Sequence, residues 1–144
     1  MSDANEIQVA GDHYKSQLQH WDWVVACGMN YFQANATKYV TRHKKKNGAE
    51  DLKKAAHYTM KLLELLTAGN AIRTDCHLTF DMKMNNVHSV VYAMMNDLDN
   101  TQQRILSLIL GEGVHDSDIA QLREALSMLH DYTQNCYGDG HDLL

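Results

Sequence analysis

Apolar residues recur at helical spacing over residues 31–66, which contain the clearest helical pattern of the chain. The second part of this stretch opens with Glu50 and Asp51, carboxylates that suit the N-terminus of a helix. Its apolar stripe consists of Leu52, Ala55, Ala56, Thr59, Leu62, Leu63 and Leu66, which are spaced to share one face. The pattern predicts a long helix with a buried face, on which the side chains turned away from the core include Asp51, Lys54, Tyr58 and Lys61.

The stretch before this helix is polar and aromatic on one side. Asn35, Lys38, Tyr39 and Arg42 are separated by three, four or seven residues, which places them on one face of a helix. A basic turn follows at residues 44–48, with the sequence Lys-Lys-Lys-Asn-Gly. Residues 31–66 are therefore expected to form a helical hairpin in which two polar stripes face each other and can hold a small anion.

The rest of the chain continues in helical periods separated by turn signals, and it contains no proline. We expect further helices at residues 22–29, closed by Gly28, at 81–98, at 101–110, and after Ser117, which can cap the last helix. Residues 9–14 precede any helical period. The predicted fold is all-α, a single-domain bundle of about five to six helices with a non-helical N-terminal segment.

No internal repeat or linker divides the sequence, so residues 1–144 are treated as one domain. Residues 9–68 are expected to carry the functional site, and residues 81–136 to provide helical packing and an oligomerisation surface. An almost continuous apolar run, which predicts burial on more than one side, is formed by Ile105, Leu106, Leu108, Ile109 and Leu110. The apolar surplus in residues 84–110 favours a homo-oligomer.

The distribution of charge says more about ligands than the net charge of −5 does. Residues 1–70 contain nine Lys and Arg against seven Asp and Glu, whereas residues 71–144 contain four against eleven. An acidic chain with one basic patch argues against extended nucleic-acid binding and favours a compact phosphate ligand. Three cysteines without CxxC spacing, no signal-like N-terminus and no membrane-length apolar run predict a soluble cytoplasmic protein.

Several chemistries lack their sequence motifs. The chain has no glycine-rich loop ending in Gly-Lys-Ser/Thr, as a P-loop requires, and no GxGxxG motif for a dinucleotide. The nine histidines are scattered without HExxH or another metal-ligand spacing, so no metal site is expected in the protein itself. The basic hairpin remains as the candidate phosphate site.

Ordered motifs between residues 9 and 66 carry a specific resemblance. They are Ala10-Gly11-Asp12-His13-Tyr14, Gln19, Trp21-Asp22-Trp23, Tyr31-Phe32, Asn35-Ala36, Lys38-Tyr39, Arg42, Lys46-Asn47-Gly48, Asp51-Leu52, Lys54-Ala55 and Tyr58. Together they resemble the phage family DUF3310, whose members are often labelled SaV-like proteins or nucleotide kinases. Ala10 and Ala34 stand where that family usually has glycine.

The resemblance implies a phage-encoded kinase of deoxynucleoside monophosphates, of the dTMP and dGMP class, without a P-loop. The implied phosphoryl donor is ATP, a triphosphate that Mg²⁺ normally accompanies. The catalytic candidates are Asp12, His13, Lys38 and Arg42. The nucleotide-binding and phosphate-binding candidates are Tyr14, Asn35, Tyr39, Lys46, Asp51, Lys54 and Tyr58. The cations would neutralise the transferred group, Asn35 would read a base edge or sugar hydroxyl, and a tyrosine would stack on the base.

Two alternatives remain open. One is an all-α MazG-like nucleoside triphosphate pyrophosphohydrolase, although Glu50, Asp51 and Glu64 do not form the ExxE and ExxD clusters of that chemistry. The other is a non-catalytic phage protein that sequesters a nucleotide or engages a host defence protein. For the kinase, replacing Lys38 or Arg42 by alanine is expected to abolish turnover and leave folding intact.

Overall fold

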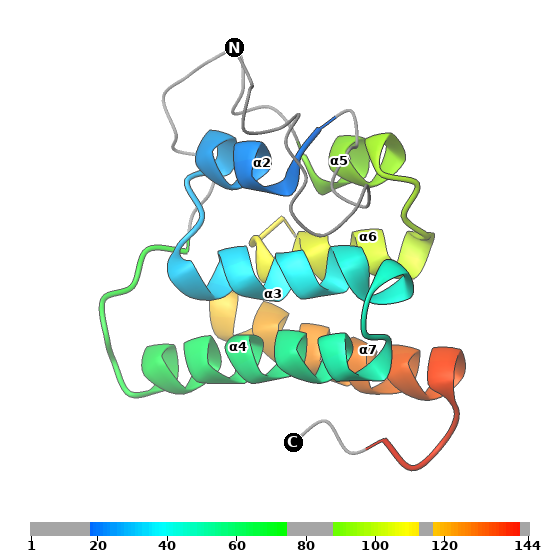
Figure 1. The fold of residues 1–144 in the computed structure, drawn as a ribbon. Helices are drawn as coiled ribbons and strands as arrows, with labels where there is room; N and C mark the ends of the chain where they lie inside the picture. Colours follow the sequence, from blue (N-terminus) through cyan, green and yellow to red (C-terminus); the bar gives the residue numbers. More distant parts are fainter. Residues whose placement is uncertain (1–17, 75–87, 113–116, 142–144) are drawn as a thin grey trace.

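The computed structural model describes residues 18–74, 88–112 and 117–141, and all the regular secondary structure of these residues is helical (Figure 1). The elements are α2 (His20–Cys27), α3 (Tyr31–Arg42), the 3-10 helix η1 (His43–Lys45), α4 (Ala49–Thr67), α5 (Ser89–Met95), α6 (Asn100–Ile109) and α7 (Asp118–Tyr137). The predicted all-α fold is confirmed. The expected non-helical N-terminal segment lies outside the described residues. None of the helices that the structure describes is both long and apolar enough to span a membrane.

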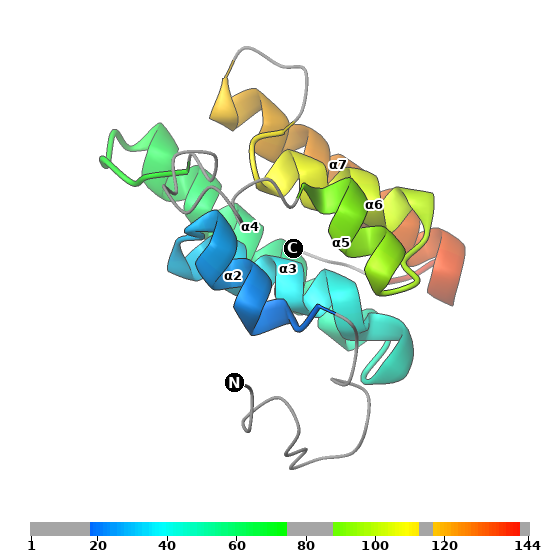
Figure 2. The same cartoon turned by 90° about the horizontal axis from the view of Figure 1, so that it is seen from above.

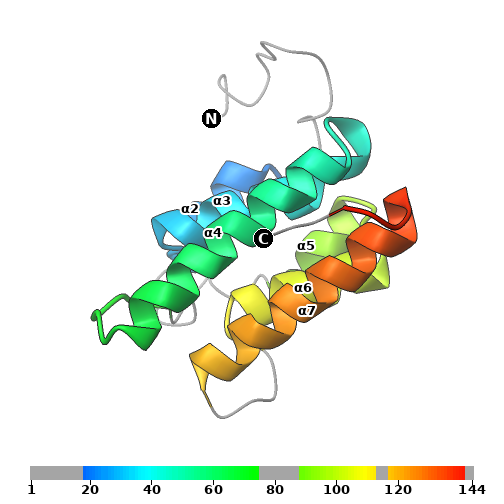
Figure 3. The ribbon, with the colours of Figure 1, turned by 90° about the horizontal axis from the view of Figure 1, so that it is seen from below.

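Two helical hairpins form the centre of the bundle. The first joins α3 to α4 and the second joins α6 to α7, and they pack with α3 against α6 and α4 against α7. Figures 2 and 3 show the two hairpins from above and from below. The short helices α2 and α5 pack against α3 and α6 and lie at the top of Figure 1. Apolar side chains from all six α-helices meet in one buried core.

Several local predictions agree with this structure. Gly28 closes α2 in the left-handed region at φ 65°, and the Ser117 side chain caps α7 by accepting a hydrogen bond from the Ala120 N–H. The predicted stripe of α4 is buried from Leu52 to Leu63. The run that begins at Ile105 is also buried, with at most 2% exposure at its five apolar positions. Because one chain is enough to bury that run, it gives no argument for an oligomer.

The helix predicted over residues 81–98 ends early. Helix α5 stops at Met95, and Asp97 takes a left-handed conformation with φ 55°. Asp97 and Asn96 are residue types that tolerate turn conformations better than most, and this turn starts the connection to α6. Residues 81–87 lie outside the described residues.

The bundle consists of two similar three-helix units, which the sequence pattern did not reveal. The first unit is α2–α3–α4 and the second is α5–α6–α7. The same number of residues separates the start of each helix in the first unit from the start of its counterpart in the second, and this number is called the constant offset. The pairs of first residues are His20 and Ser89, Tyr31 and Asn100, and Ala49 and Asp118. In Figure 1 both units have the short helix at the top, the middle helix below it and the long helix at the bottom, and Figure 2 shows the two units side by side. The two units thus share a backbone arrangement although the sequence shows no internal repeat.

Equivalent residues of the two units meet at the interface between α3 and α6. Gln33 donates from Nε2 to the Ile109 carbonyl at 3.1 Å, and Gln102 donates from Nε2 to the Val40 carbonyl at 2.9 Å. The constant offset relates the two glutamines to each other, and it also relates the two carbonyls. Both glutamine side chains are buried, at 0% and 1% exposure. The two bonds therefore form a reciprocal pair across the bundle.

Each glutamine also helps to start its own helix. The Gln33 side chain accepts a hydrogen bond from the Asn30 N–H in a capping box, and Gln102 does the same for Asp99. The rings of Trp23 in α2 and Tyr92 in α5 stack with 3.8 Å between their centroids and 8° between their planes. These two rings are again related by the constant offset. Helix starts, register and ring stacking thus repeat together from the first unit to the second.

We predict that Gln33→Ala and Gln102→Ala destabilise the protein to a similar extent. Each variant removes a capping bond and leaves a buried carbonyl without its donor, which costs about 1–3 kcal/mol. Gln33 also donates to the Thr74 carbonyl, so Gln33→Ala should lower the free energy of unfolding by at least as much as Gln102→Ala does. Urea unfolding followed by circular dichroism measures both values. Wild-type stability in either variant would contradict the reciprocal arrangement.

Candidate functional site

An ion pair closes the hairpin between α3 and α4. Arg42 donates from Nε and Nη2 to the two carboxylate oxygens of Asp51, each at 3.2 Å, and the Asn47 N–H donates to the same carboxylate at 3.1 Å. Asp51 has 0% exposure, and the Arg42 side chain has 16%. The predicted polar stripe of α4, to which Asp51 belongs, faces α3 at this point, and the contact with Arg42 buries the Asp51 carboxylate. Its carboxylate fixes Arg42 in place.

Three cations converge on the ring of Tyr39. Lys38 Nζ lies 4.6 Å from the ring centroid, Arg42 Cζ lies 4.8 Å from it, and Lys54 Nζ lies 5.4 Å from it. These distances are within the range of cation–π contacts. The predicted face of α3 and the predicted polar stripe of α4 therefore do meet, around one aromatic ring. As far as the described residues form it, this site is a partly exposed surface.

The charges around Tyr39 are only partly compensated. Asp51 balances Arg42, whereas the one ion-pair partner of Lys54 among the described residues is Glu50, at 3.9 Å and with both side chains substantially exposed. Within the described parts of the chain, Lys38 has no carboxylate within ion-pair distance. Cations held this close repel one another unless an anion lies nearby. The surface is therefore suited to bind a compact, multiply charged anion.

A row of tyrosines extends from this cationic centre. Tyr58 stacks on Tyr39 with 6.0 Å between ring centroids, and Tyr31 meets Tyr58 edge-on at 5.8 Å. A hydrogen bond with Tyr31, together with burial, raises the pKa of Tyr58. Asn35, on the same face of α3, donates from Nδ2 to the Tyr31 carbonyl at 2.9 Å. The row offers aromatic surface next to the cations.

The structure brings together most of the predicted site residues that it describes. Those around the ring are Lys38, Tyr39, Arg42, Lys54 and Tyr58, with Asn35 one turn away on α3. Asp51 is buried and bonds to Arg42. Lys46 is exposed in the turn and has no described contact with this group. Asp12, His13 and Tyr14 lie outside the described residues, so the structure does not place them.

Sequence reasoning missed Tyr31 as part of this surface. It precedes Asn35 by four residues and Tyr39 by eight, so helical spacing alone could have identified it. It also missed a buried polar network at the other side of the turn. That network joins the turn to residues near the end of the described chain, and no local pattern indicates such a contact.

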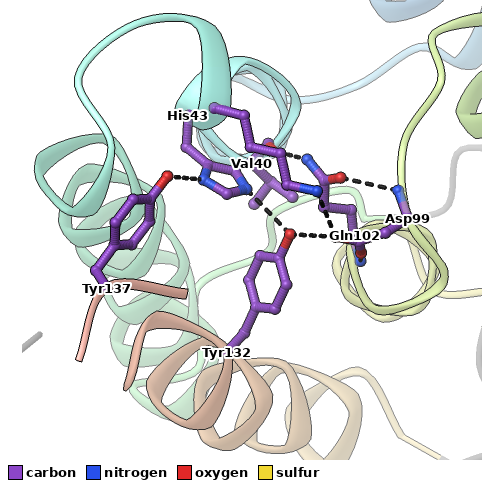
Figure 4. A network of polar contacts seen from close by, with 7 residues as sticks. Val40, His43, Asp99, Gln102, Tyr132 and Tyr137 are labelled. Atoms are coloured by element: carbon purple, nitrogen blue, oxygen red, sulfur yellow. Dashed lines mark hydrogen bonds and ion pairs between the residues drawn. The ribbon is translucent and has the colours of Figure 1, made fainter. Parts of the chain in front are cut away.

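The buried network is centred on His43 (Figure 4). His43 Nδ1 lies 2.7 Å from the Tyr137 hydroxyl, and Nε2 lies 3.1 Å from the Tyr132 hydroxyl. Tyr132 donates to Asp99 at 2.5 Å, and Lys44 donates to the same carboxylate at 2.8 Å. Since Tyr132 donates to Asp99, its oxygen accepts from His43 Nε2–H, and His43 Nδ1 accepts from Tyr137. The network ties the basic turn to α6 and α7.

Burial shifts the pKa values of the ionisable groups in this network. Burial, with a smaller effect of the nearby Lys44 charge, lowers the pKa of His43 to about 4, so its ring is neutral at pH 7. Burial also raises the pKa of Tyr132, and the hydrogen bond to Asp99 adds to that shift. For Asp99, burial works against the charge, but bonds from Lys44, Tyr132 and the Gln102 N–H hold the pKa of the carboxyl below its usual value.

Tyr137 also determines what the turn can accommodate. Gly48, which precedes α4, has φ 59° and ψ −126°, a conformation that favours glycine. A Cβ atom at this position would lie 3.2 Å from Cε1 of Tyr137. The end of α7 therefore packs directly on the turn that joins α3, with Arg42, to α4, with Asp51.

The second three-helix unit serves as an internal comparison for the site. The equivalents of Tyr31, Lys38, Tyr39 and Arg42, found by the same constant offset, are Asn100, Ser107, Leu108 and Gly111. The same backbone thus forms without tyrosines or cations at these positions. Ser107 and Leu108 are buried in the second unit, so only the first unit presents these two positions on a partly exposed surface.

One protein-family model matches the chain, over residues 5–60, and its description is "Protein of unknown function (DUF3310)". This match confirms the family resemblance. No curated protein and no solved structure matches the chain. Within the residues that the structure describes, no three His, Cys, Asp or Glu side chains gather closely enough to hold a metal ion.

We predict that the free energy of unfolding falls as the pH is lowered from about 6.5 to about 4, and that His43→Gln makes this dependence shallower. An unfolded histidine takes up a proton near pH 6.5, whereas His43 in the fold does so only near 4. The unfolded state therefore binds more protons across this interval, and acid favours it by up to about 1.4 kcal/mol per pH unit.

The measurement is urea unfolding at several pH values. Buried His20, with its pKa lowered by burial to about 3, contributes a similar dependence that both proteins share. Only the difference in slope between wild type and His43→Gln reports on His43. Equal slopes would show that His43 is protonated in the fold.

Proposed function

We propose that this chain, which carries a DUF3310 segment at residues 5–60, is a phage-encoded deoxynucleoside monophosphate kinase. Its substrates would be a nucleotide of the dTMP and dGMP class and ATP, and its phosphate site would be the cationic surface around Tyr39. The observation that carries the proposal is the convergence of Lys38, Arg42 and Lys54 on one ring. Residues from both arms of a rigid hairpin contribute to it.

The chemistry of phosphoryl transfer suits such a surface. The transferred group carries charge on several oxygens, and catalysis depends mainly on positioning it and neutralising that charge. Lys38 and Lys54 would supply point charges from two helices. Arg42, already oriented by its bidentate contact with Asp51, would supply a planar donor group. Side chains would thus do what the backbone of a P-loop does in other kinases.

Asp51 does not fit the role of a magnesium ligand. Its carboxylate is fully buried, and it already accepts bonds from Arg42 and the Asn47 N–H. Its part in the proposed enzyme is to hold Arg42 against the Tyr39 ring. Magnesium, when it accompanies ATP, stabilises the charge of the triphosphate itself.

The carboxylates named for a pyrophosphohydrolase are separated in the structure. Asp51 pairs with Arg42 inside the turn, Glu50 faces Lys54, and Glu64 faces Lys61 at 4.0 Å. Pyrophosphohydrolase chemistry uses grouped carboxylates that hold magnesium together. The arrangement of these three gives that alternative no support.

The Arg42–Asp51 contact changes how the kinase proposal is best tested. Arg42→Ala would leave a buried carboxylate unpaired, which typically costs about 3–5 kcal/mol. The expectation from the sequence that this variant folds normally is therefore unsafe, and loss of activity in it would be ambiguous. Lys38 and Lys54 avoid the problem because neither has a buried partner among the described residues.

We predict that Lys38→Ala and Lys54→Ala each lower the turnover of dTMP with ATP by about 100-fold, the effect of removing one preorganised charge-stabilising group. The measurement is chromatographic separation of dTMP, dTDP, ATP and ADP after incubation with the full chain. Lys53→Ala is the matched control, because Lys53 is exposed on the same helix and makes no described contact with Tyr39.

Three results would contradict the proposal. They are wild-type turnover in both variants, an equal loss in Lys53→Ala, and no dTDP formation by the wild-type chain. Tight nucleotide binding without product would instead identify a non-catalytic nucleotide-binding protein. Release of pyrophosphate from a triphosphate alone would identify the pyrophosphohydrolase.

A further inference from the structure

The tyrosine row extends beyond the cations that contact Tyr39, to an end that the proposed phosphate site does not use. Tyr31 and Asn35 lie at the start of α3, whereas the cations surround Tyr39 two turns later. Eight residues separate Tyr31 from Tyr39, which corresponds to about 12 Å along the helix axis. The surface therefore has a charged end and an aromatic, amide-bearing end.

Both ends belong to one continuous surface. Tyr58 contacts Tyr39 on one side and Tyr31 on the other, so the rings form an unbroken row from the cations to the start of α3. Tyr31 is 64% exposed, which is high for a large aromatic side chain. Asn35 uses its Nδ2 for the Tyr31 carbonyl, and its Oδ1 has no hydrogen-bond partner among the described residues. An exposed ring and an available acceptor thus lie together.

We propose that Tyr31 and Asn35 form the base-binding end of the site and distinguish nucleotides from simple sugar phosphates. The inference rests on the proposed function. The nucleotide lies along α3, with its phosphate at the Lys38 and Lys54 end and its base against Tyr31. The reverse orientation would place the phosphate beside electron-rich ring faces and leave the cations next to an uncharged base. Asn35 Oδ1 accepts a hydrogen bond from an N–H group at the base edge.

The second unit shows that the fold does not require these two side chains. The residues at the equivalent positions of α6 are Asn100 and Arg104, and Arg104 contacts Glu124 at 3.6 Å. Asn100 has no ring, yet α6 starts with the same type of capping box as α3. A helix of this bundle can therefore start without a tyrosine at its first position.

The test compares two ligands that share a phosphate and differ in the base. Calorimetric titration of the full chain with dTMP and with 2-deoxyribose 5-phosphate gives two dissociation constants for each variant. Tyr31→Ala should weaken dTMP binding about tenfold, the usual effect of losing one base-stacking ring. Binding of 2-deoxyribose 5-phosphate should not change. Tyr31→Phe keeps the aromatic face and should bind dTMP nearly as the wild type does.

The outcomes separate this inference from the proposed function. If wild type binds neither ligand, the phosphate site itself is refuted. If wild type binds dTMP, two results for Tyr31→Ala would refute the base-binding role. One is unchanged binding of dTMP, and the other is an equal weakening of both ligands. In either case the phosphate site stands. Asn35→Ala should likewise weaken dTMP binding alone. Circular dichroism of each variant verifies folding, which the exposure of Tyr31 leads us to expect.

Discussion

The reciprocal bonds of Gln33 and Gln102 are the constraint on which the bundle depends. A buried amide is stable only where its polar atoms are bonded, and each of these amides connects the start of its own helix to the end of the opposite one. A slip of α3 along α6 by one turn, about 5.4 Å, would separate each amide Nε2 from the carbonyl that it bonds on the opposite helix. Apolar contacts are non-directional and would resist such a slip less sharply. Two polar side chains therefore determine the register of the hairpins.

The face of α3 that carries Lys38 and Tyr39 is partly exposed, whereas the equivalent positions of α6, Ser107 and Leu108, are buried. The two units share helix starts, capping boxes and a central ring stack, and these shared features are what closing the bundle requires. Lys38, Tyr39 and Arg42 belong to the first unit alone. Clustered like charges repel one another unless an anion lies nearby, and this supports the proposed phosphate site.

Sequence patterns predicted features that depend on neighbours along the chain. The stripe of α4, the closure of α2 at Gly28 and the cap at Ser117 each follow from residues within one or two helical turns. The cationic face of α3 was also predictable, because helical spacing alone brings its residues together.

Features that depend on distant partners were missed. Asp51 is buried because Arg42 reaches it across the turn, and its place at a helix start does not reveal this burial. The two-unit architecture left almost no sequence signal, because backbone positions are shared while nearly all side chains differ. The His43 network needs Tyr132 and Tyr137, which only the folded bundle brings near the turn.

The second unit contributes to the site although it carries none of the cations. The turn after Arg42 is short and strongly basic, and a free loop of this kind would hold its charges loosely. Instead, His43 bonds the two tyrosines of α7, Lys44 bonds Asp99 at the start of α6, and Tyr137 packs on Gly48. Binding of a small anion is stronger when the groups that contact it are already in place, because less conformational freedom is lost. The second unit thus acts as the support that holds the first unit's binding surface in one shape.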